Sequence, residues 1–575
     1  MVGALAGCDR GTHATIHTEL TTTTRLRIRH CRWNGRARIG NERETAVKVV
    51  RRHEARESGV SARPARRHLY TRSMRQHLAV LGCAFVVGGC SLIYNPSNIG
   101  PGGKDATIDA PPDAPPDAEI ILDTNPAALA LTGVTPTELD EGQGSAGGRP
   151  TVLYIDGSQI TADATITLVS SDDTKTVHLT LGPPVVAADG RAIAVAVHCD
   201  VDAALPEGPL LLDVIVNQPG VAAPVKLVGL VTYHAHNELS SSDGSASIAL
   251  DASTTFSAVT YAGTIKPKAG ATAPLVIHSF STLSVGAIDV TNAGTSGFAG
   301  GNAGGASGAA GGGTGGGKSP GGGAGFAIQN AGTNGGAPSG EQALKTLDAP
   351  DRGNGGGGGG GIGCGGTGGG GGGSLSVTSG GPMTIGAVRS NGGGGTGAGL
   401  LCTAGGGGSG GAVVLRAGTT LGATAIAVDG GTAGPANGGT AGQVGGPGRV
   451  RIDQSTAPTA TVSSAGASVY RGPMFASAGA NVPPIVTQTL RPVFDFVGQP
   501  LTNFNFYVVD ASGFLHNITG NTFSDTGVAQ VMLDFDLGRG PNRVCAAVEG
   551  ATSADSTNAQ SASCVDVVYV FKPTM

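Results

Sequence analysis

Few residues in this sequence combine a reactive or metal-binding side chain with the spacing that catalysis or metal binding requires. His234, His236 and Glu238 alternate, so in a strand all three would face one side, and two imidazoles with a carboxylate can bind zinc. The cluster Asp348-Ala349-Pro350-Asp351-Arg352 holds two carboxylates, the groups that a glycosidase uses as acid and base. Gly317-Lys318-Ser319 has the closing letters of a phosphate-binding loop.

Each of these candidates has a simpler interpretation. The two histidines have no third histidine and no fourth ligand nearby, and they fit a solvent-facing strand equally well. The charged cluster lies at a proline turn. Pro320 and more glycine follow the lysine and serine, which prevents the helix that a phosphate loop requires. We therefore predict no catalytic residue, no metal site and no cofactor, and hence a protein that is not an enzyme.

Glycine dominates the composition and limits the fold. The chain has 575 residues, 101 of them glycine, and residues 291–450 hold 64 of these glycines. Glycine at this density destabilises helices and removes core-forming side chains, which argues against one large helical or α/β enzyme. The glycines follow no strict period of three along the sequence, so collagen is excluded as well.

Charge is divided between a basic leader and an acidic body. Residues 1–73 carry 16 Arg and Lys against 6 Asp and Glu, whereas from residue 90 onward there are 19 basic and 35 acidic side chains. The acidic body argues against a nucleic acid or an anionic membrane surface as a partner. The leader could be a nucleic-acid-binding arm or a transit segment, but we favour a mis-called start or a disposable leader, because Met74 opens an export signal.

The segment 74–89 has the form of a secretory signal. Arg75 and His77 are followed by an apolar run from Leu78 to Gly89, which is too short to span a bilayer. The tetrad Val87-Gly88-Gly89-Cys90 resembles the lipobox of bacterial lipoproteins. This resemblance implies cleavage between Gly89 and Cys90, attachment of lipid to the Cys90 sulfur, and acylation of the new amino group.

The lipoprotein resemblance also implies a location. Ser91 follows the lipid-bearing cysteine and, in that family's sorting rule, favours the outer membrane, facing either the periplasm or the exterior. Two alternatives remain open: an ordinary signal peptide with a chance cysteine, and a twin-arginine signal that uses Arg66-Arg67. Residues 90–124 follow as a Pro/Asp-rich tether, which should be extended because proline fixes φ and removes hydrogen-bond donors.

We expect an all-β fold in which immunoglobulin-like sandwich modules flank a glycine-rich region. Residues 125–232 contain short β-branched runs punctuated by Asp156-Gly157, Asp189-Gly190 and Glu207-Gly208, which we interpret as turns. Gly133-Val134-Thr135-Pro136 and the residues after it resemble the opening of IPT/TIG domains, which implies a fold and not an activity. Residues 456–575 hold 12 of the 23 aromatic residues and are predicted to form a second sandwich.

The region between the sandwiches is predicted to repeat. Residues 233–290 should form strands that lead into it, and strand pairs such as Leu375–Val377 with Pro382–Arg389 recur within 291–455. Recurring units of this kind predict an irregular β-solenoid, in which each coil buries what it cannot bury alone. Glycine-rich chains can also pack as polyproline-II-like layers. The alternative is a partly disordered linker, which glycine and serine normally indicate.

The cysteines fit an exported protein. Cys545 and Cys564 lie on the last two predicted strands, and we predict a disulfide between them. Cys364 and Cys402 both fall in glycine loops and are a possible second pair. With Cys199 the chain after Cys90 has five cysteines, so at least one of them has no partner within the chain.

Together these features predict a lipid-anchored protein of the outer membrane with a structural or adhesive role. Its partners would be the membrane, through the N-terminal lipid, and an extracellular glycan or protein ligand. The alternative is a carbohydrate-active enzyme similar to the right-handed β-helix lyases and glycosidases, or a polysaccharide-binding protein at the cell surface.

Overall fold

The structure is a computed structural model of the whole chain, which divides into two compact units, residues 1–120 and 121–575. It describes residues 16–17, 27–28, 128–172, 174–202, 204–241, 247–325, 334–336, 353, 355–360, 364–422, 424–456, 460–477, 486–549 and 562–572. In the first unit the described residues are the antiparallel pair β1 (Ile16–His17) and β2 (Arg27–Ile28). Gly89 and Cys90, which flank the predicted cleavage site, lie outside the described residues. None of the helices among the described residues is long and apolar enough to cross a membrane.

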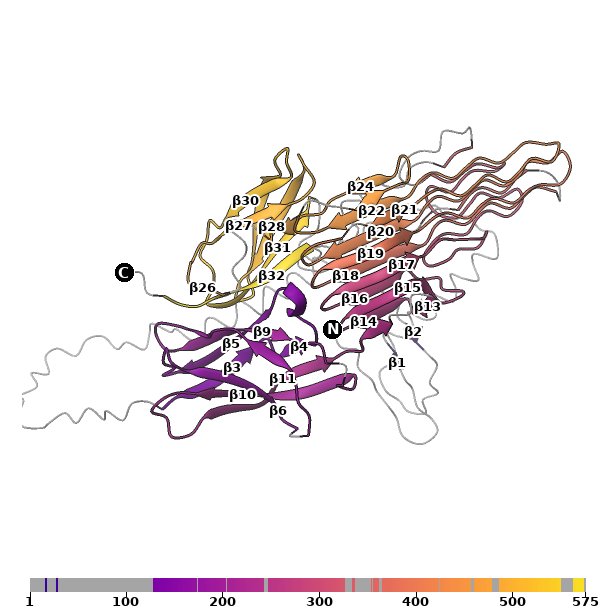
Figure 1. Cartoon of the computed structure of the whole chain (residues 1–575). Helices are drawn as coiled ribbons and strands as arrows, with labels where there is room; N and C mark the ends of the chain where they lie inside the picture. The colour runs from indigo at the N-terminus through magenta and orange to yellow at the C-terminus, as the bar shows by residue number, and fades with distance from the viewer. Residues whose placement is uncertain are drawn as a thin grey trace, which may run out of the picture. The chain divides into compact units, whose positions relative to one another are not determined.

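The second unit is built from strands, so the predicted all-β class is confirmed (Figure 1). Its first part is a sandwich of two sheets. One sheet has the order β3 (Ala130–Thr135), β5 (Thr151–Ser158), β9 (Ala192–Cys199) and β7 (Leu179–Leu181), with β8 (Val185–Val186) also paired to β9. The other has the order β4 (Glu138–Asp140), β11 (Val225–Ala235), β10 (Gly208–Asn217) and β6 (Thr165–Ser170). Leu153 and Val195 from the first sheet meet Leu212 and Val231 from the second in one buried core.

One predicted turn in this sandwich is wrong. Asp156-Gly157 lies inside β5, where the pairing of β3 with β5 shifts register between Leu131 and Gly133. A Cβ on Gly157 would overlap the carbonyl oxygen of Ala130, so this glycine permits a close approach of two strands. Gly190, by contrast, has the positive φ of 66° that a turn uses.

The middle part is a stack of parallel strands. From β14 to β24, consecutive strands alternate between two sheets, and from β15 each strand pairs in parallel with the one two places earlier (Figure 1). One sheet contains β12 (Leu239–Ser241), β13 (Ser247–Leu250), β15 (Val259–Pro267), β17 (Leu283–Asp289), β19 (Met383–Arg389), β21 (Ala425–Ala427) and β23 (Thr461–Val462). The other contains β14 (Ser253–Phe256), β16 (Leu275–Ser279), β18 (Ser374–Ser379), β20 (Ala412–Ala417), β22 (Arg449–Asp453) and β24 (Ser468–Tyr470).

Aliphatic ladders hold the two parallel sheets together. Equivalent residues of successive strands stand directly beside one another, and their side chains are buried between the sheets. One such ladder is Ile277, Val377, Leu415 and Ile452. Each coil therefore buries its apolar face against the coil before and after it, which explains why the strand pairs recur in the sequence.

The glycine segments continue from the ends of these strands and pack side by side (Figure 1). They are the described parts of 290–373, together with 390–411 and 428–448, and we call them the glycine bundle. Along residues 366–374, every third backbone N–H donates a hydrogen bond to the same neighbouring segment. One series of donor–acceptor pairs is Gly366–Thr403, Gly369–Gly406 and Gly372–Ser409, and a second is Gly368–Gly305, Gly371–Asn302 and Ser374–Ala299.

A hydrogen-bond period of three identifies the conformation. Polyproline II has three residues per turn and no internal hydrogen bonds, so its N–H groups point in turn to three different neighbours. Exposure follows the same spacing between Ala303 and Ala306, which are both exposed while Gly304 is half-buried and Gly305 is buried. Inner segments face neighbours on all three sides, and a Cβ on Gly369 or Gly408 would overlap the backbone of an adjacent segment. The bundle is therefore ordered, unlike the flexible linker that its composition allows.

The last part is a second sandwich with an aromatic core. A three-stranded sheet has the order β25 (Met474–Phe475), β27 (Val493–Val497) and β30 (Val528–Met532). The other sheet has the order β26 (Val486–Thr487), β32 (Ala562–Tyr569), β31 (Gly540–Val548), β28 (Asn503–Val509) and β29 (Leu515–Thr522). Phe494 and Phe496 from the small sheet pack against Phe504 and Phe506 from the large one.

Candidate functional site

The reversal between β19 and β20 is the best candidate for a functional site. The chain leaves β19 at Arg389, returns to β20 at Ala412 and reverses near residue 400. At about 3.1 Å per residue, ten residues of polyproline II place this reversal roughly 30 Å beyond the end of the strand. We call residues 399–402, residues 437–440 and Cys364 the bundle tip.

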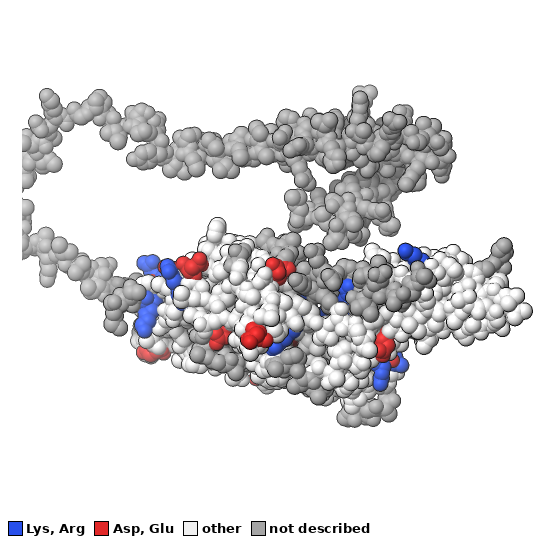
Figure 2. All heavy atoms as spheres, turned by 90° about the horizontal axis from the view of Figure 1, so that it is seen from above, with Lys and Arg blue, Asp and Glu red and all other residues white. Residues whose placement is uncertain are grey.

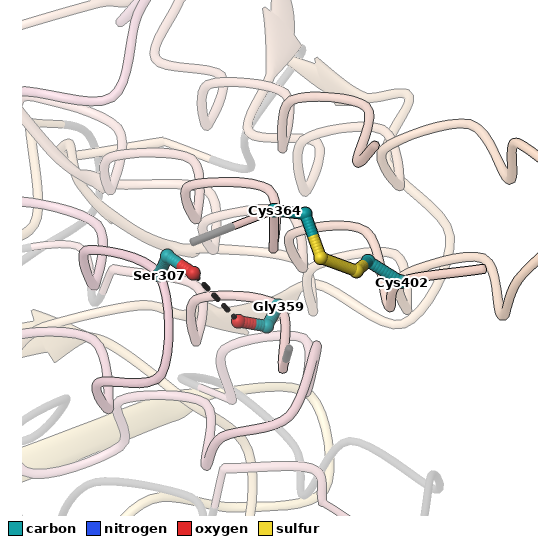
Figure 3. Close-up of a disulfide and its surroundings, with 4 residues drawn as sticks. All are labelled: Ser307, Gly359, Cys364 and Cys402. Atoms are coloured by element: carbon teal, nitrogen blue, oxygen red, sulfur yellow. Dashed lines mark hydrogen bonds between the residues drawn. A yellow bond between two sulfur atoms is a disulfide. The ribbon is translucent and has the colours of Figure 1, made fainter. Parts of the chain in front are cut away.

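Covalent and hydrogen bonds fix the bundle tip. A disulfide joins Cys364 to Cys402 (Figure 3). The backbone N–H of Gly399 donates to the carbonyl oxygen of Cys364 at 2.7 Å, and that of Leu401 donates to Asn437 at 3.1 Å. Three chain segments that are far apart in sequence are thus tied together at this end of the bundle. Figure 3 also shows the Ser307 hydroxyl near the disulfide, donating to the carbonyl oxygen of Gly359 at 3.4 Å.

The bundle tip presents two leucines to solvent. Leu400 is 71% exposed and Leu401 is 76% exposed. Leu401 has a φ of 63°, a left-handed conformation that costs a side-chain-bearing residue about 1–2 kcal/mol. A Cβ on neighbouring Gly438 would lie 3.3 Å from Leu400 Cδ1, so this position is kept small beside the leucine pair. The leucines are held outward by the backbone around them.

The bundle tip is uncharged. Its residues are Gly399, Leu400, Leu401, Cys402, Asn437, Gly438, Gly439, Thr440 and Cys364. In the view of Figure 2, the described surface at the far end of the glycine bundle is white. Any partner of this surface must be recognised without ion pairs.

A buried ion cluster anchors the coils from which the bundle extends. Asp453 on β22 accepts charge-assisted hydrogen bonds from Arg416 on β20 and from Arg451 on its own strand. The N–H of Gly472 is a third donor to this carboxylate, at 2.8 Å. Burial alone would raise the pKa of Asp453, but the positive charges of Arg451 and Arg416 hold it below its ordinary value. Polar and apolar residues alternate along β22, a pattern typical of half-buried strands, yet all five of its residues are buried.

His236, one of the two histidines considered as zinc ligands, has other partners. His236 follows the end of β11, and its Nε2 lies 2.9 Å from Asp140 Oδ1 while its ring stacks on Phe280. Glu141 accepts bonds from the backbone N–H groups of Asp202 and His236, and burial raises the pKa of Glu141. In the described part of the chain, no group of three or more His, Cys, Asp and Glu side chains could hold a metal ion.

The other residues that the sequence analysis singled out are the charged cluster at 348–352, Lys318 and the cysteines. Residues 348–352 lie outside the described residues. Lys318 belongs to the glycine bundle, where its N–H donates to Asn334 and its carbonyl oxygen accepts from Gly322. Cys545 and Cys564 are directly opposite on β31 and β32 and are joined by a disulfide. Cys199 is the free cysteine of the described residues, and it is buried.

Sequence reasoning missed the leucine pair and the ion cluster, whereas it had included polyproline-II-like packing among the possibilities for the glycine segments. The spacing of Ala303 and Ala306 was an available signal for the bundle, whereas the exposed leucines had none. No family model matches the sequence, and neither the curated proteins nor the solved structures include one that is similar to it.

Proposed function

We propose that the chain is a lipid-anchored protein of the cell envelope, with a structural or adhesive role at the surface rather than a catalytic one. The observation that carries the proposal is the glycine bundle. Its segments are joined by backbone hydrogen bonds to neighbours on several sides, so it can hold its free end at a fixed distance from the strand stack. A stiff projection with an exposed apolar end suits a protein that makes contact with another surface.

Support for the anchor comes from the sequence. The signal-like run from Met74, the lipobox-like tetrad at Val87-Gly88-Gly89-Cys90 and the Pro/Asp tether follow one another in the order that an anchored protein needs. The tether would lift residues 125–575 away from the outer membrane. Both disulfides are consistent with an oxidising compartment outside the cytosol.

The remaining modules fit the same role. The two-sheet sandwich of residues 128–235 supports the IPT/TIG-like interpretation, and such modules serve as spacers or binding surfaces. The alternating parallel strands of residues 253–470 support the interpretation as a solenoid, and the sandwich of residues 474–569 is proposed as a second immunoglobulin-like domain.

The parallel stack also favours one alternative, a polysaccharide-binding or carbohydrate-active protein. Stacked parallel coils are the architecture of the β-helix lyases and glycosidases that the sequence analysis gives as the alternative. Asp453, the buried carboxylate of β22, is hydrogen-bonded to two arginines, so its role is to stabilise the strand stack. A binding role thus has more support than hydrolysis.

Two measurements test the proposal. Mass spectrometry of the mature N-terminal peptide from membrane fractions should find lipid on Cys90, and an unmodified N-terminus in a soluble fraction would contradict the anchor. A pull-down with purified glycans and matrix material should show retention without cleavage. Release of shortened products would instead favour the carbohydrate-active alternative.

A further inference from the structure

We propose that the bundle tip inserts Leu400 and Leu401 among the acyl chains of an uncharged lipid bilayer. The inference rests on the proposed function and names the partner of the surface described there. Both leucines are more than two-thirds exposed, and they are adjacent, so they form a single apolar patch. Apolar surface of this kind gains free energy when it leaves water.

The charge of the bundle tip determines which surface it fits. None of its residues is charged, whereas the chain from residue 90 onward has a large acidic excess. An anionic bilayer would repel the acidic body, and the bundle tip has no lysine or arginine to offset that repulsion. A zwitterionic bilayer carries no net charge, and Asn437 and Thr440 beside the leucines can hydrogen-bond to its headgroups.

The small size of this apolar patch favours a bilayer over a protein as its partner. A stable protein interface needs about 800 Å² of surface from each partner. Even large aromatic side chains bury only about 150–250 Å² each, so two leucines supply well under this area. A bilayer requires no matching surface, because an apolar group only has to pass about 5–10 Å into the headgroup and acyl boundary.

The bonds within the bundle tip keep the leucines available. The bond from Gly399 to Cys364 and the disulfide at Cys402 fix the backbone on both sides of the pair. The left-handed backbone of Leu401 turns its side chain outward instead of toward the bundle. Because the geometry is set before contact, little conformational freedom is lost on insertion.

Tryptophan fluorescence tests insertion at the bundle tip directly. The full chain receives either Leu401→Trp or the matched control Leu501→Trp and is matured by its host; it is encoded with Trp33→Phe, so that no natural tryptophan remains even if the leader is retained. Leu501 is 74% exposed and has a φ of 56°, so the two sites share exposure and backbone conformation. With vesicles of brominated phosphatidylcholine, we expect a blue shift and quenching of Trp at 401 and neither effect at 501.

A second experiment tests the consequence for adhesion. The full chain is reconstituted in donor vesicles and mixed with labelled phosphatidylcholine acceptor vesicles. We expect Leu400→Ser combined with Leu401→Ser to abolish tethering, while Leu501→Ser retains it. An unquenched Trp at 401, or tethering by the double-serine variant equal to wild type, overturns the inference. If Cys90 carries lipid and glycan or matrix retention persists in that case, the proposed function stands and only the bilayer partner is wrong.

Discussion

Arg416 and Asp453 are direct register partners on the adjacent parallel strands β20 and β22, and Arg416 Nη2 lies 3.0 Å from Asp453 Oδ2. Arg451 brings a second guanidinium nitrogen to within 2.9 Å of the same oxygen. All three side chains are buried or nearly so. In this coil, an ion pair connects β20 to β22 in addition to the aliphatic ladders.

Replacing Asp453 with asparagine should destabilise the protein strongly. The substitution leaves two buried guanidinium groups without this carboxylate, and breaking a buried ion pair costs about 3–5 kcal/mol. The urea midpoint of unfolding should fall accordingly. Asp251→Asn is the control, because Asp251 pairs with Lys268 while 71% exposed, and such a pair contributes at most about 1 kcal/mol. Equal shifts for the two variants would contradict the structural role of the cluster.

The same cluster predicts a pH dependence. The pKa of Asp453 is lower in the folded state than its ordinary value of about 3.9. Its contribution to the free energy of unfolding is therefore complete above that ordinary value and is lost as the pH falls through the folded pKa. Unfolding midpoints recorded between pH 6 and pH 2 should show a decline below about pH 4 that is smaller in Asp453→Asn. A decline of the same size in both proteins would exclude Asp453 as its source.

Glycine substitutions should separate the interior of the bundle from its exterior. Gly369→Ala places a methyl group against the carbonyl oxygen of Gly393, and overpacking of this kind costs about 1–3 kcal/mol. Gly294 belongs to the same bundle, but a Cβ there has no neighbour closer than 4.0 Å. Gly294→Ala should be neutral or stabilising by about 0.4–1 kcal/mol. Calorimetry measures both effects, and equal tolerance at the two positions would contradict the close packing.

The sequence predicted the parallel stack better than the bundle, for a physical reason. Strands such as Met383–Arg389 show their apolar face through alternating side chains, so their existence could be predicted. The order of the bundle resides in backbone N–H and C=O groups, which every glycine carries equally. Only outward positions, such as Ala303 and Ala306, reveal the period of three.

The missed features share a different cause. Arg451 and Asp453 alternate with apolar residues, which normally indicates one solvent-facing side. Their burial depends on Arg416, 37 residues before Asp453, and on the register of three strands. Leu400 and Leu401 resemble ordinary core residues in the sequence, and only their place at a chain reversal exposes them.

The disulfide of the bundle tip should stabilise the end of the bundle more than its base. Cys364→Ser combined with Cys402→Ser removes a cross-link between residues 38 apart, and disulfides typically contribute about 2–4 kcal/mol. Hydrogen exchange of Leu401 and Ala404 should accelerate, because their N–H bonds to Asn437 and Thr440 are near the cross-link. Exchange within β20 should change little. Uniform acceleration along the bundle would show that the cross-link stabilises all of it.

Cys199 should be inert in the folded protein and reactive in the unfolded one. Burial, together with the nearby negative charges of Asp140, Asp200 and Glu141, raises the pKa of its thiol to about 12. The thiolate is the reactive form, so iodoacetamide at pH 8 should leave Cys199 unmodified in the native state and modify it fully in guanidinium chloride. Peptide mass spectrometry measures both states, with the chain left unreduced so that the two disulfides stay closed. Rapid native labelling of Cys199 would mean that the end of β9 opens readily, which its full burial in the sandwich core contradicts.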